Sequence, residues 1–158
     1  RKYDTAAFFA VTERLRRYFP HCGLTADLIT GFPGETEADH AATLAFIERC
    51  AFSAMHVFPY SRRPGTPADR MPDQLTAAVK SRRAAEAHAL AERMRGEYLA
   101  SCVGRTLEVL FETEEGGVST GHASNYAEVS VPGTGLRGLV KNVEISSVSG
   151  TMLVGAAI

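Results

Sequence analysis

Two short loops rich in glycine and proline hold the residues whose types and spacing could do chemistry. The first reads Gly-Phe-Pro-Gly-Glu-Thr from Gly31 and follows an apolar run. Gly31 and Gly34 have no side chains to keep a ligand away, and Pro33 limits the conformations lost on binding. Glu35 places a carboxylate beside a helix N-terminus, which carries a partial positive charge. The pattern favours a loop whose backbone contacts a ligand directly, and a structural turn entering a helix is the open alternative.

The second loop carries two cations. Arg62 and Arg63 follow an apolar run, and Pro-Gly-Thr-Pro comes directly after them. This stiff segment predicts guanidinium groups aimed from a strand end, where they suit a phosphate or a carboxylate. A surface pair held by local salt bridges is the alternative. No catalytic role is expected for any of the histidines, which are His21, His40, His56, His88 and His122.

Alternating helices and strands are predicted to position both loops. A helix capped by Thr5 is expected to end near residue 20, and strands are expected at about 24–32 and 55–60. Between the strands, a capping box of Thr36 and Asp39 begins a helix that ends near residue 50. This order is typical of a parallel sheet with crossover helices, whose carboxyl-terminal strand ends hold both loops. The apolar stripes of the two helices are Phe8, Val11, Leu15 and Tyr18, and Ala41, Leu44, Ile47 and Cys50.

The second half of the chain changes from a helical to a strand period. A long helix is expected from Gln74 to about Cys102, where Gly104 ends it. From Arg105 onward apolar and polar residues alternate, and turn residues separate five short strands, which suggests a small closed or partly open barrel. The fold class is therefore α/β followed by all-β. The expected strands begin near residues 107, 118, 125, 139 and 151, and the expected divisions of the chain are 1–73, 74–103 and 104–158.

Two parallel strands and their helices cannot cover both faces of a sheet, whereas all-parallel sheets are normally buried on both sides. The chain is therefore expected to be a fragment that begins in the middle of a domain. Its exposed sheet edges invite pairing with another copy, so we expect strand or helix exchange between chains.

Composition and cysteines narrow the class of protein. The chain has 158 residues, 45% of them hydrophobic, and a net charge of -1, which is typical of a globular protein. No apolar run reaches the roughly 20 residues that span a bilayer, and the N-terminus lacks a signal-peptide core, so a cytoplasmic location without a membrane partner is expected. Three widely spaced cysteines, Cys22, Cys50 and Cys102, predict reduced thiols and no metal site.

Charged residues are grouped in alternating basic and acidic blocks, and the basic blocks indicate where a polyanion could bind. Residues 1–23 carry five basic and two acidic residues, and residues 62–95 carry eight basic and four acidic ones. Residues 24–61 and 104–158 are both net acidic. A nucleic acid would therefore meet its phosphates mainly along the two basic blocks, and a solvated helix face is the alternative.

The segments Asp27–Thr36 and His56–Ala68, with the opening Arg1-Lys2-Tyr3, resemble the radical S-adenosylmethionine methylthiotransferases, and the tRNA-modifying branch fits best. Members of that family have an N-terminal domain with one iron–sulfur cluster, a radical barrel with a Cys-x3-Cys-x2-Cys motif, and a C-terminal β-barrel called the TRAM domain. The resemblance covers the last third of this plan. It implies a partial radical-SAM (βα) barrel followed by a five-stranded, OB-like TRAM barrel.

The resemblance also implies roles for individual residues. Cofactor contacts fall on the two strands and the first loop, at Ile29, Gly31, Glu35, Val57 and Phe58. Substrate contacts fall on the second loop, at Arg62, Arg63 and Thr66. Because the TRAM segment is net acidic, only Arg105, Arg137 and Lys141 are phosphate candidates there, and Tyr126 could stack on a base.

The activity implied for the full-length protein is methylthiolation of tRNA with S-adenosylmethionine and two 4Fe-4S clusters. His56–Ser61, Leu110–Glu112 and Asn125-Tyr126 are more similar to the enzymes acting on threonylcarbamoyladenosine at position 37 than to those acting on isopentenyladenosine or a ribosomal-protein aspartate. The cysteine triad is absent, so the chain alone is expected to be inactive, without bound cofactor or metal.

The implied partners are tRNA and the missing N-terminal part of the same protein. A non-catalytic RNA-binding module is the rival interpretation. An unrelated phosphate-loop enzyme is disfavoured, because Gly-x4-Gly-Lys-Ser/Thr is absent and no acid–base pair stands out.

Overall fold

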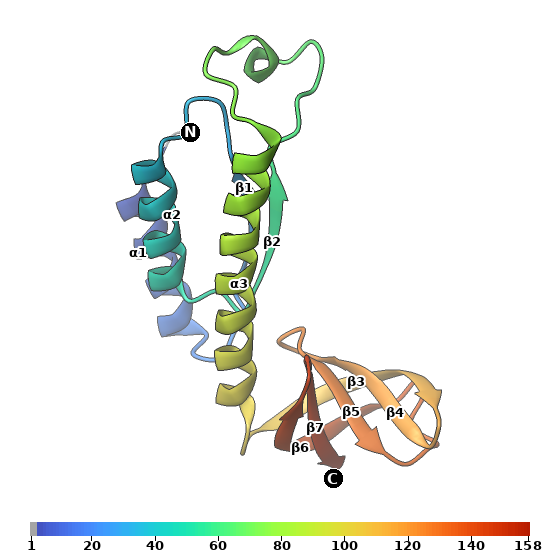
Figure 1. Cartoon of the computed structure of the whole chain (residues 1–158). Coiled ribbons are helices and arrows are strands. Elements are labelled where there is room, and N and C mark those ends of the chain that lie inside the picture. The colour runs from blue at the N-terminus through green and yellow to red at the C-terminus, as the bar shows by residue number, and fades with distance from the viewer. Residues whose placement is uncertain (1–2) are drawn as a thin grey trace. The chain divides into compact units, whose positions relative to one another are not determined.

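A computed structural model describes residues 3–158 (Figure 1), so Arg1 and Lys2, which contribute to the family resemblance, lie outside the described residues. One compact unit runs up to Tyr18 and covers Leu24–Arg95, and a second contains Phe19–Gly23 and Gly96–Ile158. The predicted fold class, α/β followed by an all-β barrel, is confirmed. The elements are α1 (Thr5–Tyr18), β1 (Thr25–Thr30), α2 (Glu37–Cys50), β2 (Ala54–Pro59), a 3-10 turn η1 (Pro67–Arg70), α3 (Ala77–Cys102), β3 (Thr106–Glu115), β4 (Val118–Ala123), β5 (Glu128–Pro132), β6 (Val140–Ser149) and β7 (Met152–Ala157).

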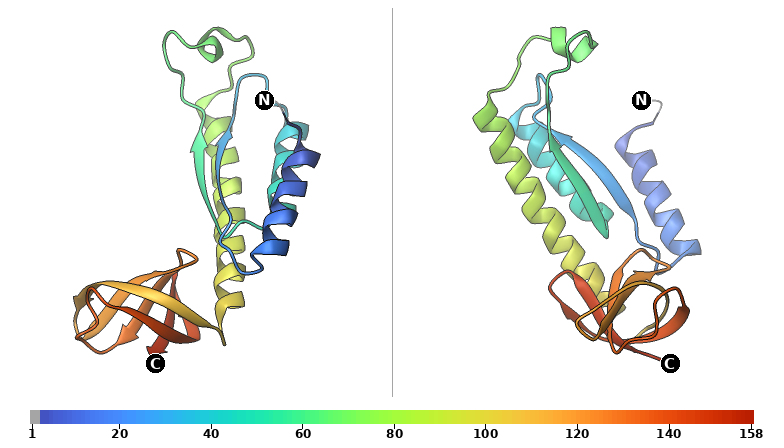
Figure 2. Two further views of the ribbon diagram at one scale, coloured as in Figure 1. Left: turned by 180° about the vertical axis from the view of Figure 1, so that it is seen from behind. Right: turned by 90° about the vertical axis from the view of Figure 1, so that its right-hand side faces the viewer.

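β1 and β2 form a two-stranded parallel sheet, as predicted, with Leu28 opposite Val57. Helices lie on one side of this sheet only (Figure 2). Leu28 and Val57 pack there against α2 and the alanine-rich side of α3. The opposite face stays exposed, because successive side chains of a strand point to opposite faces.

α1 begins one residue earlier than its expected cap, Thr5, would place it. Asp4, rather than Thr5, caps the helix, because its Oδ1 accepts a hydrogen bond from Ala7 N at 2.8 Å. The predicted apolar stripe is largely exposed at Val11, Leu15 and Tyr18. Only its first member, Phe8, joins the core, where it packs with Phe46 and Phe52.

α2 has the predicted capping box at Thr36 and Asp39, in which each side chain bonds the other's backbone. Its buried stripe differs from the prediction at one end. Ala41 is exposed and His40 is buried in its place, whereas Ile47 and Cys50 are buried as expected. His40 is paired with Glu86 of α3 at 2.8 Å, which explains how a polar residue occupies a core position.

α3 is the predicted long helix, although it starts at Ala77 rather than Gln74. The Gln74 side chain instead donates to the carbonyls of Ala68 and Met71 and holds the preceding loop. Asp73 has a left-handed backbone with φ 58°, which no helix interior allows.

The second half forms a closed five-stranded barrel in the order β3-β4-β5-β7-β6, with β6 pairing back to β3. The period-two pattern of β3 is confirmed, since Val109 and Phe111 are fully buried and Leu110 is exposed. Closure removes free sheet edges, and the enclosed side chains form the core. That core also contains Val129, Val143, Ile145 and Leu153.

Two glycines let the barrel strands bend. Gly121 of β4 faces Phe111, where the β3 register shifts, and Gly155 of β7 faces Ile145, where the β6 register shifts. A Cβ on Gly121 would lie 1.9 Å from Leu110 O, and one on Gly155 would lie 2.3 Å from Glu144 O. Each bulge therefore requires a glycine on the neighbouring strand, as at the corners of other small barrels.

Within residues 3–158, no helix is long and apolar enough to cross a bilayer. The same residues contain no group of three or more His, Cys, Asp or Glu side chains that could hold a metal ion.

Candidate functional site

The exposed face of the two-stranded sheet carries an apolar pair. Ile29 and Phe58 are register partners on β1 and β2, and their side chains are 55% and 52% exposed. Asp27 and His56 lie on the same face, two register pairs nearer the start of the strands. Val57 points the other way into the core, so only its backbone can contribute to this face.

Glu35 holds the first loop together from inside. Its Oε2 accepts hydrogen bonds from Gly31 N at 2.9 Å and Phe32 N at 3.3 Å. Its Oε1 accepts from Arg83 Nη1 at 2.7 Å. Both carboxylate oxygens are therefore engaged by the protein itself, and the geometry favours a bracing role over the expected contact with ligand hydroxyl or ammonium groups.

The two glycines of this loop are required for different reasons, one by packing against α3 and the other by the conformation of the turn. Gly31 has φ +73°, and a Cβ there would lie 2.5 Å from Cγ of Lys80 on α3. Gly34 has φ +80° with open space around it, and its N–H donates to Asp73 O. Gly31 thus needs glycine because of α3, whereas Gly34 needs it for the turn itself.

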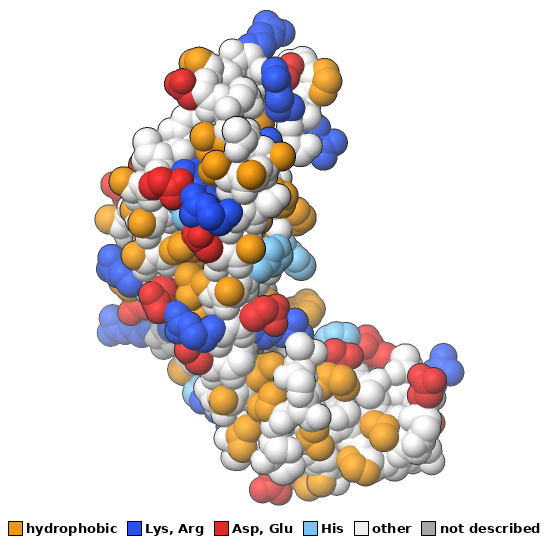
Figure 3. Space-filling model, in the orientation of Figure 1, with side chains coloured by type: hydrophobic (Ala, Val, Ile, Leu, Met, Phe, Trp, Pro, Cys, Tyr) orange, Lys and Arg blue, Asp and Glu red, His pale blue; other side chains and the backbone are white. Residues whose placement is uncertain are grey.

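Charged side chains of α3 meet those of α2 and the first loop. The Arg83 side chain is 2% exposed and donates to Glu35 and to Glu37 Oε1 at 2.7 Å. Arg82 bridges Glu37 and Glu86 on the surface. Basic and acidic side chains accordingly intermix over this helical surface (Figure 3). Much of the basic block at 62–95 is thus neutralised by acidic partners.

These contacts lower the pKa values of two acidic side chains, Glu37 and Glu86. Hydrogen bonds from Arg83 and Arg82 lower the pKa of Glu37 to about 2. Hydrogen bonds from His40 and Arg82 lower the pKa of Glu86.

The second loop is braced by one of its two arginines. Arg62 Nε donates to Asp69 Oδ1 at 2.9 Å, and its Nη2 donates to Asp69 O. Thr66 caps η1 and donates its hydroxyl to Arg63 O. Arg62 and Thr66 thus shape the loop, and the exposed Arg63 is the residue of the three that is better placed to reach an anion.

The three candidate cations of the barrel do not form one patch. Arg105 precedes β3, whereas the backbone of Arg137 is bound by Glu114 near the other end of that strand. Lys141 lies on β6 opposite Val109, between these two positions. Hydrogen bonds from the Arg137 backbone and from neighbouring loop groups lower the pKa of Glu114 below its ordinary value.

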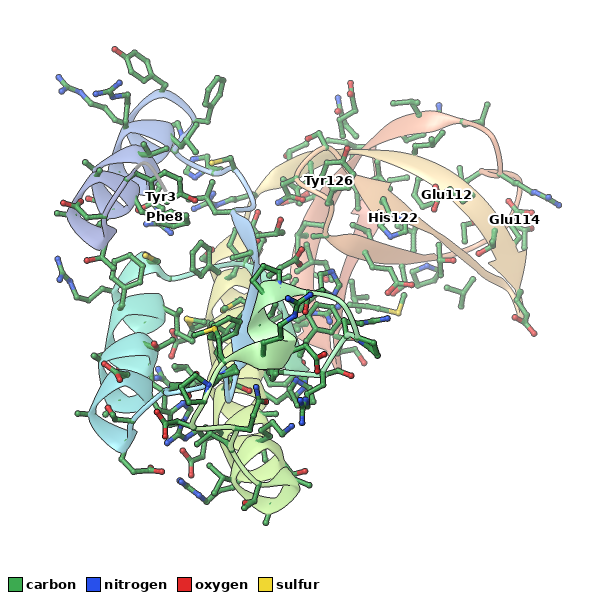
Figure 4. The ribbon with its side chains drawn as sticks, turned by 90° about the horizontal axis from the view of Figure 1, so that it is seen from above. Tyr3, Phe8, Glu112, Glu114, His122 and Tyr126 are labelled. Atoms are coloured by element: carbon green, nitrogen blue, oxygen red, sulfur yellow. The ribbon has the colours of Figure 1, made fainter. Side chains whose placement is uncertain are left out.

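Tyr126 is the most prominent aromatic side chain of the barrel, with 87% of its surface exposed. Its backbone is left-handed (φ 64°) and its N–H donates to Ala123 O at 2.8 Å, so a tight turn presents the ring. A groove of about 490 Å³ beside it also contains Glu112 and His122, which form a 2.7 Å pair. Figure 4 shows the three side chains along one side of the barrel.

Sequence reasoning missed Arg83 and His40, although helical phase carried a signal for both. Arg83 falls on the same helix face as Ala87 and Met94, which are buried, and His40 precedes Leu44 and Ile47 by one and two turns. The three cysteines are free, and Cys50 and Cys102 are buried.

The chain is similar to known tRNA-modifying proteins. It is 40% identical over 139 residues to threonylcarbamoyladenosine tRNA methylthiotransferase MtaB of Bacillus subtilis, covering 85% of this chain and 31% of the relative. It is 44% identical over 116 residues to the tRNA-2-methylthio-N(6)-dimethylallyladenosine synthase of Mycolicibacterium smegmatis, covering 73% and 23% respectively. The synthase of the same name from Paenarthrobacter aurescens is 41% identical over 116 residues, covering 73% and 22%.

No protein-family model matches the chain. The chain spans less than a third of the length of these relatives. Over most of its own length it aligns with them at 40% identity or more, and its α/β part precedes a five-stranded barrel. The chain therefore belongs to the radical S-adenosylmethionine methylthiotransferase family, of which it matches the C-terminal part.

Proposed function

We propose that this chain supplies part of the cofactor pocket and an RNA-docking barrel to an enzyme that methylthiolates threonylcarbamoyladenosine at position 37 of tRNA. The observation that carries the proposal is the bare sheet face, where Ile29 and Phe58 stand side by side next to the loop at 31–36. Parallel sheets are normally covered on both faces, so an uncovered apolar face suggests that something binds there. In such sheets, ligands bind at the carboxyl ends of the strands.

The residues of this face fit an adenosyl group. Two neighbouring apolar side chains offer a surface for a flat ring, and the strand ends beyond them offer backbone polar groups. When bound, S-adenosylmethionine supplies the hydrogen-abstracting radical and the methyl group. Ile29 and Phe58 would orient the adenine, while Glu35 keeps Gly31 and Phe32 in place.

The two 4Fe-4S clusters are assigned to the remainder of the longer protein, because the three cysteines of this chain are dispersed: Cys22 lies between α1 and β1, Cys50 ends α2 and Cys102 ends α3. We further propose that the open edge of β1, with the apolar cavity of about 450 Å³ between it and α1, receives that remainder. Tyr3 and Phe8 line this cavity (Figure 4). The chain alone is then inactive.

The proposed domain boundaries are 1–73, 74–103 and 104–158, and the proposed location is the cytoplasm. Charge in the barrel favours an orienting contact with RNA over strong phosphate binding, since residues 104–158 are net acidic. Stacking on Tyr126 suits this role, because every base offers a π-face. Arg63, Arg105, Arg137 and Lys141 would add separate phosphate contacts.

The proposed reaction is tested by nucleoside mass spectrometry. The longer protein is reconstituted with its clusters and incubated with S-adenosylmethionine and tRNA that carries unmethylthiolated threonylcarbamoyladenosine. The expected product is the 2-methylthio derivative of that nucleoside. A protein that binds S-adenosylmethionine but modifies no tRNA nucleoside would refute the proposal.

A second candidate substrate is dimethylallyladenosine. The observation in its favour is that the relatives named for this nucleoside reach 45% identity, against 40% for the relative named for threonylcarbamoyladenosine. The latter match is preferred because it covers 85% of the chain rather than 73%. Methylthiolation of dimethylallyladenosine alone in the same assay would assign this second substrate.

The barrel's role is tested by the variant Y126A, with Y126F as its matched control. Loss of one base stack costs about 1–3 kcal/mol, so tRNA affinity should fall by roughly 5- to 150-fold in Y126A and little in Y126F. Equal tRNA affinities of Y126A, Y126F and the wild type would show that Tyr126 does not contact the tRNA. Strong tRNA binding by residues 74–158 without any modification by the longer protein would instead favour a non-catalytic RNA-binding module.

A further inference from the structure

Arg83 is the only Lys, Arg, Asp or Glu within residues 3–158 that is buried, with 2% of its side-chain surface exposed. Enclosing a guanidinium group is costly unless acceptors surround it. Burial by itself lowers the pKa of Arg83, but hydrogen bonds to Glu37 and Glu35 outweigh this, and the net direction is upward. Arg83 is therefore a permanently charged group held inside the α/β unit.

The acceptors of Arg83 lie at the first loop and the start of α2. Its Nη1 donates to Glu35 O at 2.8 Å and to Glu35 Oε1 at 2.7 Å, and its Nη2 donates to Glu37 Oε1 at 2.7 Å. One planar group thus fixes both the backbone and the side chain of Glu35. A lysine ammonium, which is a compact point charge, cannot span the same acceptors in the same plane.

Glu35 passes this constraint to the loop backbone. The carboxylate oxygen that does not contact Arg83 accepts from Gly31 N and Phe32 N, so the guanidinium is linked through one side chain to the residues that follow β1. Ile29, on the bare sheet face, lies two residues before Gly31. The link runs from α3 to the edge of the proposed cofactor site, and no local sequence pattern requires it.

We propose that Arg83 is a positioning residue for the cofactor, acting through Glu35 to hold the backbone of Gly31 and Phe32 in the geometry that S-adenosylmethionine meets. This inference rests on the proposed function. Replacing a buried ion pair with apolar groups need not destabilise a protein, so the stability of the fold alone gives no reason for a charge here. A loop whose shape must be fixed before ligand binding does give one.

The neighbouring residue provides a matched control. Arg82 also pairs with Glu37, but it is about half exposed and does not contact Glu35. R83M and R82M therefore each remove one arginine and one contact with Glu37, and only R83M releases Glu35. R83K tests whether charge without the bidentate geometry is enough.

The first measurement is S-adenosylmethionine affinity and steady-state kinetics in the longer reconstituted protein. R83M should weaken cofactor binding by roughly 5- to 150-fold, the usual range for coupling between two sites, and R83K should lie between R83M and the wild type. The KM for S-adenosylmethionine should rise while the KM for tRNA stays unchanged. R82M should match the wild type in both. Equal cofactor affinity of R83M and R82M would overturn the inference.

The second measurement needs no cofactor and uses this chain alone. Amide hydrogen exchange at Gly31 and Phe32 should be faster in R83M than in R82M, because only the former frees the Glu35 carboxylate. E35Q should accelerate the same two amides, which keeps the test open if R83M fails to fold. Unchanged exchange in both R83M and E35Q would refute the link through Glu35. A wild-type longer protein that binds no S-adenosylmethionine would refute the proposed function, and with it the cofactor role of Arg83 but not the exchange result.

Discussion

Placing a methyl group on Gly121 should destabilise the barrel strongly. The new Cβ of G121A would lie 1.9 Å from Leu110 O and 2.7 Å from Phe111 Cα, whereas real Cβ contacts essentially never fall below 3.0 Å. Both obstacles are backbone atoms, so no side-chain rotation relieves them and β4 must separate from β3. Overpacking costs about 1–3 kcal/mol. Each ladder hydrogen bond stretched by the separation adds about 1 kcal/mol. We expect a total loss of about 3–4 kcal/mol, a large part of the stability of a small domain.

The control for this substitution is the same change in a helix. Gly96 lies in α3, and apart from its chain neighbours and the adjacent helix backbone no atom lies within 4 Å of its ideal Cβ position. G96A should therefore stabilise by about 1 kcal/mol through helix propensity. Urea unfolding should be followed by amide NMR signals of the barrel, because the chain has no tryptophan for fluorescence. A G121A barrel that unfolds within 1 kcal/mol of the wild type would refute the assignment of Gly121 to a steric role.

Three further predictions concern charge and association. Because the folded-state pKa of Glu37 is about 2 against an ordinary 4.5, its stabilising effect should be complete above pH 4.5 and disappear as the pH falls toward 2. Acid unfolding of E37Q should show a smaller loss over that window, and an NMR-detected pKa near 4.5 would contradict this. R63A should lower the salt dependence of tRNA binding by the slope of about one phosphate, whereas R62A, whose side chain is held by Asp69, should change the slope less. The isolated chain should self-associate through its open β1 and β2 edges, as light scattering after size exclusion would reveal, and a monomer at every concentration would count against exchange.

Local signals made most of the fold predictable. The capping box at Thr36 and the alternation in β3 each depend on residues within a few positions, so they can be read directly from the chain. The face that each helix buries was less certain. Helical spacing identified an apolar stripe on α1, yet Val11 and Leu15 are exposed, because spacing does not say what covers a stripe.

The sequence predicts the strands that carry the candidate site but not the contacts inside it. Ile29 and Phe58 were placed on adjacent strands, and the register confirms that they are partners. The engagement of Glu35 by Arg83, 48 residues later, depends on where α3 passes the loop. Helical phase separates Arg83, on the buried side of α3, from the exposed Arg82. Pairings of that length need the tertiary structure, since the helix phase indicates burial but not the partner.

The bulge and glycine pairs of the barrel have a consequence for how this domain can change over time. Gly121 and Gly155 set the curvature of the strands from the backbone, and the enclosed core sets their spacing. Neither depends on the outward side chains of β3 and β4, among them Glu112 and His122. The outer surface can therefore drift in charge and take on new contacts while the barrel stays closed, so an acidic barrel and a basic one can share the same architecture.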